Sequence, residues 1–94
     1  MAQQTATIVN KRGLHARAAA KFASTAASFA ARVQVRLFCE THPGQWIDGK
    51  SVMSLMLLAA TQGTSIELHV EGDDEAQALE TLCALIANRF EEDE

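Results

Sequence analysis

Hydrophobic and polar residues alternate in two parts of the chain, which predicts two strands. The alternating segments are Arg32–Phe38 and Ser65–Glu71. This spacing is typical of a strand with one buried and one solvated face. In the second segment, we expect the core side to hold Ile66, Leu68 and Val70 and the solvated side to hold Glu67, His69 and Glu71. A β-branched run predicts a further strand at 5–9, and a brief one is expected at 45–47 after a turn at His42-Pro43-Gly44.

Apolar residues recur at helical spacing from Ala16 to about Ala30, an alanine-rich stretch that predicts a helix. The expected apolar stripe is Ala19, Phe22, Ala23, Ala26 and Phe29. The small side chains on this stripe let the helix lie close to a sheet.

Two more helices are expected, each with a recognisable start. Ser51 can cap a short helix from Val52 to Ala60, and Gly63 fits its left-handed C-terminal cap. Asp74 and Gln77 resemble a capping box that opens the last helix. The apolar face of that helix is expected to contain Leu79, Leu82, Cys83, Ile86 and Phe90.

The resulting order, β-α-β-β-α-β-α, contains no internal repeat and no linker. Strands with one polar face beside amphipathic helices imply an antiparallel sheet that helices cover on one side. We therefore expect an α+β fold, an open-faced β-sandwich with a four-stranded antiparallel sheet under three helices. It spans residues 1–94 as a single domain, with 91–94 as an acidic tail.

Composition narrows the function classes. A formal net charge of −4 argues against a nucleic-acid partner, because neutralising phosphates needs a surplus of lysine and arginine. No apolar run approaches the roughly 20 residues of a membrane helix, and no signal-peptide pattern precedes the first strand. Cys39 and Cys83 lack metal-site spacing and are expected to be buried thiols in a reducing cytoplasm.

The stretch GQWIDGKS, 44–51, matches the phosphate-binding pattern G-x-x-x-x-G-K-[ST], but its context argues against a nucleotide site. A P-loop follows a buried apolar strand, and the residues before Gly44 are polar. Trp46 and Ile47 are also too bulky for a tight anion nest. The stretch is better interpreted as a turn and a helix cap.

The segment GLHARAAAKFA, 13–23, places His15 directly before the alanine-rich helix. The amides of Ala16 and Arg17 at the helix start favour an anion there, and the Arg17 side chain adds a fork of donors. A phosphoryl group on the imidazole would meet these donors. From spacing alone, a surface histidine beside a helix remains an equal alternative.

This segment resembles the active-site sequence G-L-H-A-R-P-A of HPr, the histidine-containing phosphocarrier family of the bacterial phosphotransferase system. IDGKSVMSLMLLAATQG, 47–63, resembles the family's second signature segment. The resemblance implies that enzyme I phosphorylates His15 on Nδ1 beside Arg17, and that enzyme IIA proteins accept the group. It also implies that Ser51 is the site of HPr kinase/phosphorylase. Such a protein is a stoichiometric carrier, needs no cofactor or metal, and is expected to be a cytoplasmic monomer.

Partner docking is expected beside His15. The short helix after Ser51 is too apolar to bury all of its residues, and we expect Met53 and Val52 to contribute to an exposed patch. Ala16 and Ala20 keep the approach open. One residue departs from the family pattern: Ala18 stands where proline is usual.

Two other functions compete with the relay. One is a regulatory paralogue in the same family that acts only by binding proteins, which the presence of both His15 and Arg17 disfavours. The other is a metal-binding module, although the candidate ligands follow no zinc pattern. These candidates are His15, Cys39, His42, His69 and Cys83.

Overall fold

The protein forms a four-stranded antiparallel sheet in the computed structural model, which describes residues 2–41 and 44–91. Its strands are β1 (Ala2–Thr7), β2 (Arg32–Leu37), β3 (Ile47–Asp48) and β4 (Ser65–Glu71). They lie in the order β1-β4-β2-β3, so the first and last strands of the chain pair at one edge. The predicted turn at His42 and Pro43, the candidate metal ligand His42 and residues 92–94 of the expected acidic tail lie outside the described residues.

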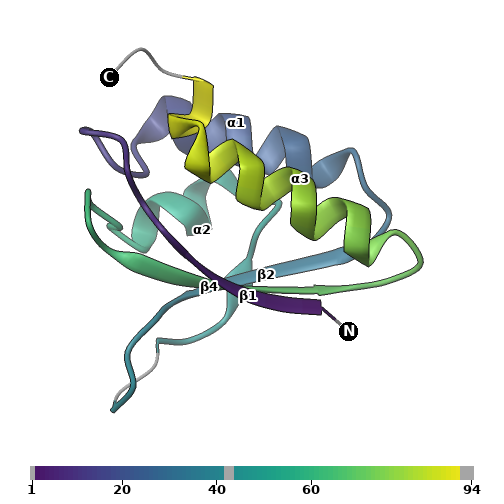
Figure 1. Ribbon diagram of the computed structural model, residues 1–94. Helices are drawn as coiled ribbons and strands as arrows, with labels where there is room; N and C mark the ends of the chain where they lie inside the picture. The colour runs from purple at the N-terminus through teal and green to yellow at the C-terminus, as the bar shows by residue number, and fades with distance from the viewer. Residues whose placement is uncertain (1, 42–43, 92–94) are drawn as a thin grey trace.

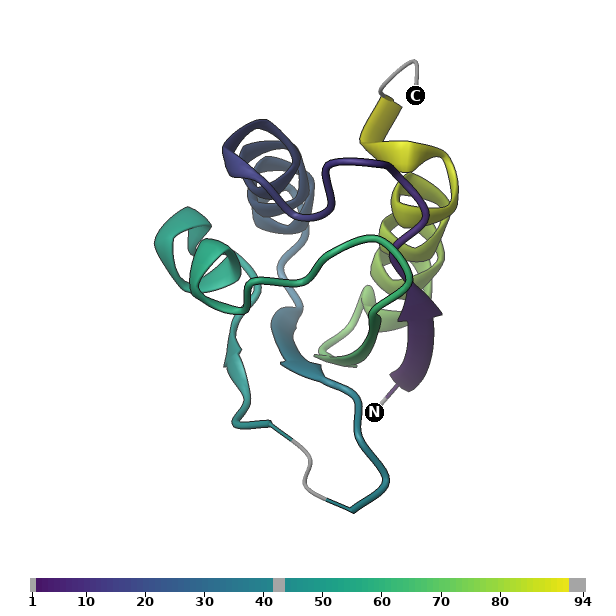
Figure 2. The same ribbon diagram turned by 90° about the vertical axis from the view of Figure 1, so that its left-hand side faces the viewer.

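Three helices cover one face of the sheet: α1 (Ala16–Ala27), α2 (Val52–Leu57) and α3 (Glu75–Ala87). Figure 1 shows the sheet below and the helices above it, with the opposite face of the sheet uncovered. In Figure 2, α1 and α2 lie side by side and α3 lies above β1. The open-faced α+β sandwich predicted from the sequence is confirmed.

The core lies between the sheet and the helices. The alternation in β2 and β4 sends every second side chain toward the helices, and the helical stripes meet them. Fully buried residues from the sheet are Val33, Val35, Ile66, Leu68 and Val70, and those from the helices include Phe22, Leu55, Leu82 and Ile86.

Several element boundaries differ from the sequence prediction: β1 ends at Thr7 rather than at position 9, β2 ends at Leu37 rather than Phe38, and β3 covers Ile47–Asp48 rather than 45–47. Strand β1 begins at Ala2 rather than at position 5, and it pairs with β4 from Ala2 to Thr7. The start of β1 was not predicted because its residues are mostly polar, and an edge strand leaves many of its positions exposed to solvent. Helix α1 ends at Ala27 rather than near Ala30, since the Ser28 hydroxyl donates to the Thr25 carbonyl at 2.6 Å and closes the last turn.

The predicted end of α2 is wrong. The helix stops at Leu57 rather than Ala60, and Gly63 does not cap it. Instead Ala59 adopts the left-handed conformation, with φ of 54°. Gly63 is also left-handed, but its amide donates to the Ile8 carbonyl at 2.8 Å and joins the end of β1 to the loop before β4.

The capping box predicted for α3 is also wrong. The Asp74 side chain makes no cap hydrogen bond and instead accepts from the amides of Ala30 and Ala31, each at 2.9 Å. Glu75 accepts from the Gly72 amide at 3.2 Å. Phe90, expected on the face of α3, lies beyond the helix in the turn Arg89–Glu91, where all three residues have positive φ. Burial of Phe90 in the core accompanies this left-handed turn.

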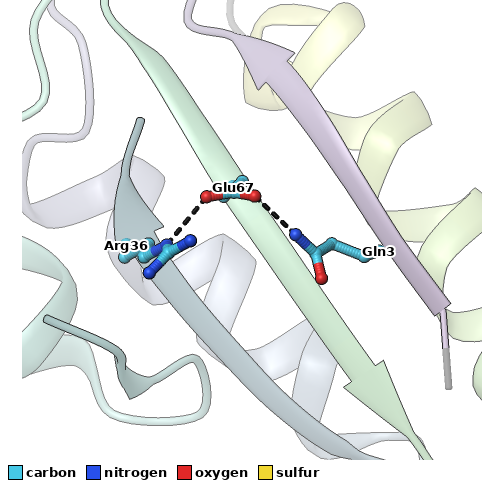
Figure 3. A network of polar contacts seen from close by, with 3 residues as sticks. All are labelled: Gln3, Arg36 and Glu67. Carbon is cyan, nitrogen blue, oxygen red and sulfur yellow. Dashed lines mark hydrogen bonds and ion pairs between the residues drawn. The ribbon is translucent and has the colours of Figure 1, made fainter. Parts of the chain in front are cut away.

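Glu67 was expected to be solvated, but it is largely buried. It lies on the uncovered side of the sheet, yet it is only 8% exposed. Figure 3 shows its carboxylate between two neighbouring strands: Arg36 Nε donates at 2.7 Å and Gln3 Nε2 at 2.5 Å. The hydrogen bond from Arg36 keeps the pKa of Glu67 below its ordinary value despite the opposing effect of burial. Arg36 also stacks on the Trp46 ring, with its guanidinium carbon 4.3 Å from the ring centroid.

Candidate functional site

His15 caps the N-terminus of α1 and is half-exposed. Its backbone is extended, with φ of −79° and ψ of −179°, and its carbonyl accepts the first helical hydrogen bond, from Ala19 at 2.8 Å. The ring nitrogen Nδ1 accepts the Arg17 amide at 3.3 Å. A nitrogen that accepts a hydrogen bond carries a lone pair, so this lone pair of Nδ1 faces the positive end of the helix.

The loop before His15 is held in place by the loop that follows α2. The Leu14 amide donates to the Ala60 carbonyl at 2.9 Å. Gly13 has φ of 67°, and a Cβ there would lie 2.5 Å from that same carbonyl oxygen. Asn10 Nδ2 donates to the Gly13 carbonyl at 2.8 Å. The close contact therefore requires glycine at position 13, and it fixes the backbone that leads into His15.

The first turn of α1 suits an anion. Ala16 and Arg17 are both exposed, and the turn contains no acidic residue. The Arg17 amide contacts Nδ1, and its exposed side chain adds a positive charge to this turn. His15 is thus the N-cap of α1, with Ala16 and Arg17 in the first turn behind it.

Ser51 caps α2, as expected. Its Oγ accepts the Ser54 amide at 3.2 Å, and its carbonyl accepts from Leu55 at 3.1 Å. Lys50, which could have faced a phosphate on Ser51, points elsewhere: its Nζ donates to the Phe29 carbonyl at 2.9 Å. The cap places the Ser51 hydroxyl at the positive end of a short helix.

Part of α2 forms an exposed apolar surface, which we call the α2 patch and define as Met53, Met56 and Leu57. Met53 is 72% exposed and Leu57 is 81% exposed, whereas Leu55 between them is fully buried. Val52, expected beside Met53, is partly buried against the core. Ala16 and Ala20 on α1 are exposed, as expected.

Leu57 was not singled out from the sequence, although a signal was present. Met53 and Leu57 are four residues apart, which puts them on one face of a helix, and the buried Leu55 lies on the other. Periodicity alone does not say which face of a short apolar helix meets the sheet.

Among the described residues, the two thiols and His69 do not gather at this site. Cys39 was expected to be buried but is exposed, because it lies in the loop after β2 rather than on a strand. Cys83 is half-buried, and burial raises the pKa of its thiol. His69 lies against the edge of the Trp46 ring, 5.6 Å between centroids. Within residues 2–41 and 44–91, no three His, Cys, Asp or Glu side chains lie close enough together to hold a metal ion.

Comparisons with known proteins identify relatives along the whole chain. Residues 2–88 match the family model PTS-HPr, described as the PTS HPr component phosphorylation site. Phosphocarrier protein HPr of Pseudomonas aeruginosa is 50% identical over 88 residues, which cover 94% of this chain and 93% of the relative. A crystal structure of HPr from Thermoanaerobacter tengcongensis superimposes with a TM-score of 0.87 at 38% identity, covering all of both chains. A structure of an HPr dimer from the same organism has a TM-score of 0.71 at 39% identity, covering 98% of this chain and all of the other.

Proposed function

The chain belongs to the HPr phosphocarrier family, and from this premise we propose that His15 receives a phosphoryl group from phosphorylated enzyme I and passes it to enzyme IIA proteins. The observation that carries the proposal is the hydrogen bond from the Arg17 amide to His15 Nδ1 at the start of α1. It indicates a lone pair on the nitrogen that must act as nucleophile.

Transfer needs one bond to form as another breaks. The Nδ1 lone pair attacks phosphorus, the bond between phosphorus and the donor nitrogen breaks, and the donor nitrogen keeps that electron pair. Once Nδ1 carries the group, the amides of Ala16 and Arg17 can donate to its oxygens, and the Arg17 guanidinium offsets their charge. In the onward transfer, a nucleophilic nitrogen of the enzyme IIA protein attacks phosphorus, the bond between phosphorus and Nδ1 breaks, and Nδ1 keeps that electron pair.

Incubation with phosphoenolpyruvate and enzyme I tests this function. Wild type should acquire one phosphoryl group that is labile in acid and stable in base, and His15→Ala should acquire none. His69→Gln is the matched control, because His69 lies on the opposite face of the sheet, and it should be phosphorylated like wild type. Full phosphorylation of His15→Ala would overturn the proposal.

We further propose that the donor and acceptor proteins dock on the α2 patch together with Ala16, Ala20 and Val52. Exposed methionine and leucine side chains suit a surface that must bind more than one partner. The protein then acts as a stoichiometric carrier, in the cytoplasm and as a monomer, without cofactor or metal. Within the described residues, no helix has the length and apolar character to cross a bilayer.

Ser51 is proposed as a regulatory phosphorylation site for HPr kinase/phosphorylase. A phosphate there would gain from the N-terminus of α2, so the fold need not change. It would also bring negative charge to the α2 patch, and partners that bury this patch would bind less well. A regulatory paralogue that only binds proteins would use the same surface, and it would fail to acquire a phosphoryl group in the assay above.

A further inference from the structure

Asn10 is a polar residue that is fully buried in the loop before His15. Its exposed fraction is 0%, and burying an amide side chain is costly unless it forms hydrogen bonds. Asn10 Nδ2 donates to the Gly13 carbonyl at 2.8 Å, and the Gly13 amide donates to the Asn10 carbonyl at 3.2 Å. Two hydrogen bonds therefore close the turn from Asn10 to Gly13, and only one of them uses a side chain.

The peptide unit between Gly13 and Leu14 is hydrogen-bonded on both sides. Its carbonyl, from Gly13, accepts from Asn10, and its amide, from Leu14, donates to the Ala60 carbonyl at 2.9 Å. The loops that contain these groups lie at the same end of the sheet, where β1 ends and β4 begins (Figures 1 and 2). Because a peptide unit is planar, hydrogen bonds on its two sides fix its orientation. Only the dihedral angles of Leu14 and His15 then separate this plane from the imidazole.

The imidazole depends on this support because its own contact with α1 is long. The distance from the Arg17 amide nitrogen to His15 Nδ1 is 3.3 Å, at the long end of the range for hydrogen bonds. His15 is also half-exposed, so packing restrains its ring only in part. A small rotation of the preceding peptide unit would carry Nδ1 away from the first turn, and a misplacement of about 1 Å can lower a rate roughly 100-fold.

We propose that Asn10 is a positioning residue for phosphoryl transfer, which holds His15 Nδ1 against the first turn of α1 by way of the Gly13 carbonyl. The proposal rests on the function proposed above and adds a residue that lies outside both the transfer chemistry and the α2 patch. Burial strengthens the hydrogen bond from Asn10, because water does not compete for it. Positioning of this kind raises the rate of the chemical step and leaves partner binding unchanged.

Two substitutions remove the Asn10 donor in different ways. N10A removes most of the side chain, whereas N10L keeps a similar volume and buries no polar group, so it should fold even if N10A does not. Both keep the backbone hydrogen bond of the turn. In both variants, the maximal single-turnover rate of phosphorylation by phosphorylated enzyme I should fall roughly 10-fold to 100-fold. The variant concentration that gives half of this rate should stay within about twofold of the wild-type value.

The Arg17 amide reports on positioning without any phosphoryl transfer. In the NMR spectrum of the unphosphorylated protein, at about pH 9 where imidazole is ordinarily neutral, its proton resonance should move upfield in N10A and N10L. The physical reason is the weakened hydrogen bond to Nδ1. V70A is the matched control for lost stability, because it truncates a buried side chain at the opposite end of β4. It should keep the wild-type Arg17 resonance and the wild-type maximal rate.

The proposal fails if N10L keeps either the wild-type maximal rate or the wild-type Arg17 resonance. It also fails if V70A slows transfer as much as N10L, or if the loss lies in the half-saturating concentration, since Asn10 would then act on stability or on docking. A wild-type protein that acquires no phosphoryl group would refute the relay function instead, and the Arg17 resonance would still decide whether Asn10 positions the imidazole.

Discussion

Ala18 is the third residue of α1, and it stands where the family usually has proline. Its amide lies in the first turn, where a helix has no internal acceptor to offer, so proline would lose no helical hydrogen bond there. We expect Ala18→Pro to raise the free energy of unfolding by about 0.5–1 kcal/mol, because the unfolded chain loses freedom. We also expect the rate of His15 phosphorylation to change, because proline would fix the backbone angle φ in the first turn of α1. Urea unfolding and single-turnover kinetics measure both effects.

The control for this change is Ala20→Pro, two residues further along. The amide at position 20 belongs to the regular hydrogen-bond ladder of the helix, so proline there should cost about 3 kcal/mol. If Ala18→Pro transfers phosphoryl groups at the wild-type rate, or loses stability as Ala20→Pro does, the account of the first turn is wrong.

The contribution of Glu67 to the free energy of unfolding depends on pH. Its pKa in the folded protein is below the ordinary value near 4.5, because Arg36 donates to the carboxylate. Ionised Glu67 therefore stabilises the fold above the unfolded-state pKa, and this contribution is lost as the pH falls through the lower folded-state value. Glu67→Gln should be less stable than wild type at pH 7, and the difference should shrink as the pH falls below about 4.5.

Glu71→Gln supplies the comparison, because Glu71 lies on the same face of β4 but is exposed. Its effect on the free energy of unfolding should stay within about 0.5 kcal/mol at every pH. A difference for Glu67→Gln that does not vary with pH would contradict the assigned role of the ionised carboxylate.

The sequence predicts local features of single residues well and long-range polar contacts poorly. His15 at a helix start and Ser51 as a cap follow from their immediate neighbours, because capping involves residues two or three positions apart. The burial of Glu67 depends on Arg36 and Gln3, which are 31 and 64 residues away. Alternation places Glu67 on the correct face of the sheet, but it carries no information about these partners.

At the scale of elements, the six residues of α2 combine a buried anchor with an exposed apolar surface. Leu55 anchors the helix in the core, and Met53 points outward. Met53→Glu should reduce the kcat/KM for phosphoryl transfer from enzyme I roughly tenfold, because a charge in a buried interface patch costs about 1–2 kcal/mol. Its free energy of unfolding should change by less than about 0.5 kcal/mol.

Phe38→Glu is the matched control for the α2 patch. Phe38 is an exposed apolar residue directly after β2, outside α1 and α2, and its amide donates to the Ser65 carbonyl at 3.0 Å. Its replacement should leave transfer unchanged. Equal losses in both variants would point to a general effect of negative charge rather than to docking on α2.

Element boundaries were predicted less well than element types, for a physical reason. The type follows from periodicity, which a run of six to thirteen residues records clearly. The end of α2 depends instead on the contact between Ala60 and Leu14, which draws the chain away from the helix axis. A hydrogen bond between two loops 46 positions apart leaves no periodic trace.

For the whole molecule, the order of strands in the sheet lies beyond what periodicity predicts. The element sequence β-α-β-β-α-β-α is compatible with several pairings, and the observed order places β4 in the centre between β1 and β2. The central strand is the one with the strictest alternation, and it has the most buried residues. The strand with the most buried residues thus lies between two neighbours, which indicates that burial, rather than strand propensity, selects the pairing.

Asp74 connects distant parts of the molecule. It precedes α3, and its two carboxylate oxygens accept from the Ala30 and Ala31 amides between α1 and β2. Gly72 approaches the same connection so closely that a Cβ there would lie 2.7 Å from the Ala31 Cα. Asp74→Asn would turn an amide NH₂ toward one of these backbone donors. The free energy of unfolding in urea should fall by about 1–3 kcal/mol, because one of two hydrogen bonds to a charged carboxylate is lost and the other becomes a neutral one.

Asp73→Asn removes the same charge at the adjacent, exposed position and should change stability by less than about 0.5 kcal/mol. Because Asp74 is at the opposite end of α1 from His15, its loss should also leave the initial rate of His15 phosphorylation unchanged under conditions where the variant remains folded. A stability loss shared by both variants would mean that negative charge near α3, rather than the two hydrogen bonds, holds the α1–β2 connection. A loss confined to Asp74→Asn would show that one carboxylate couples the last helix to the first.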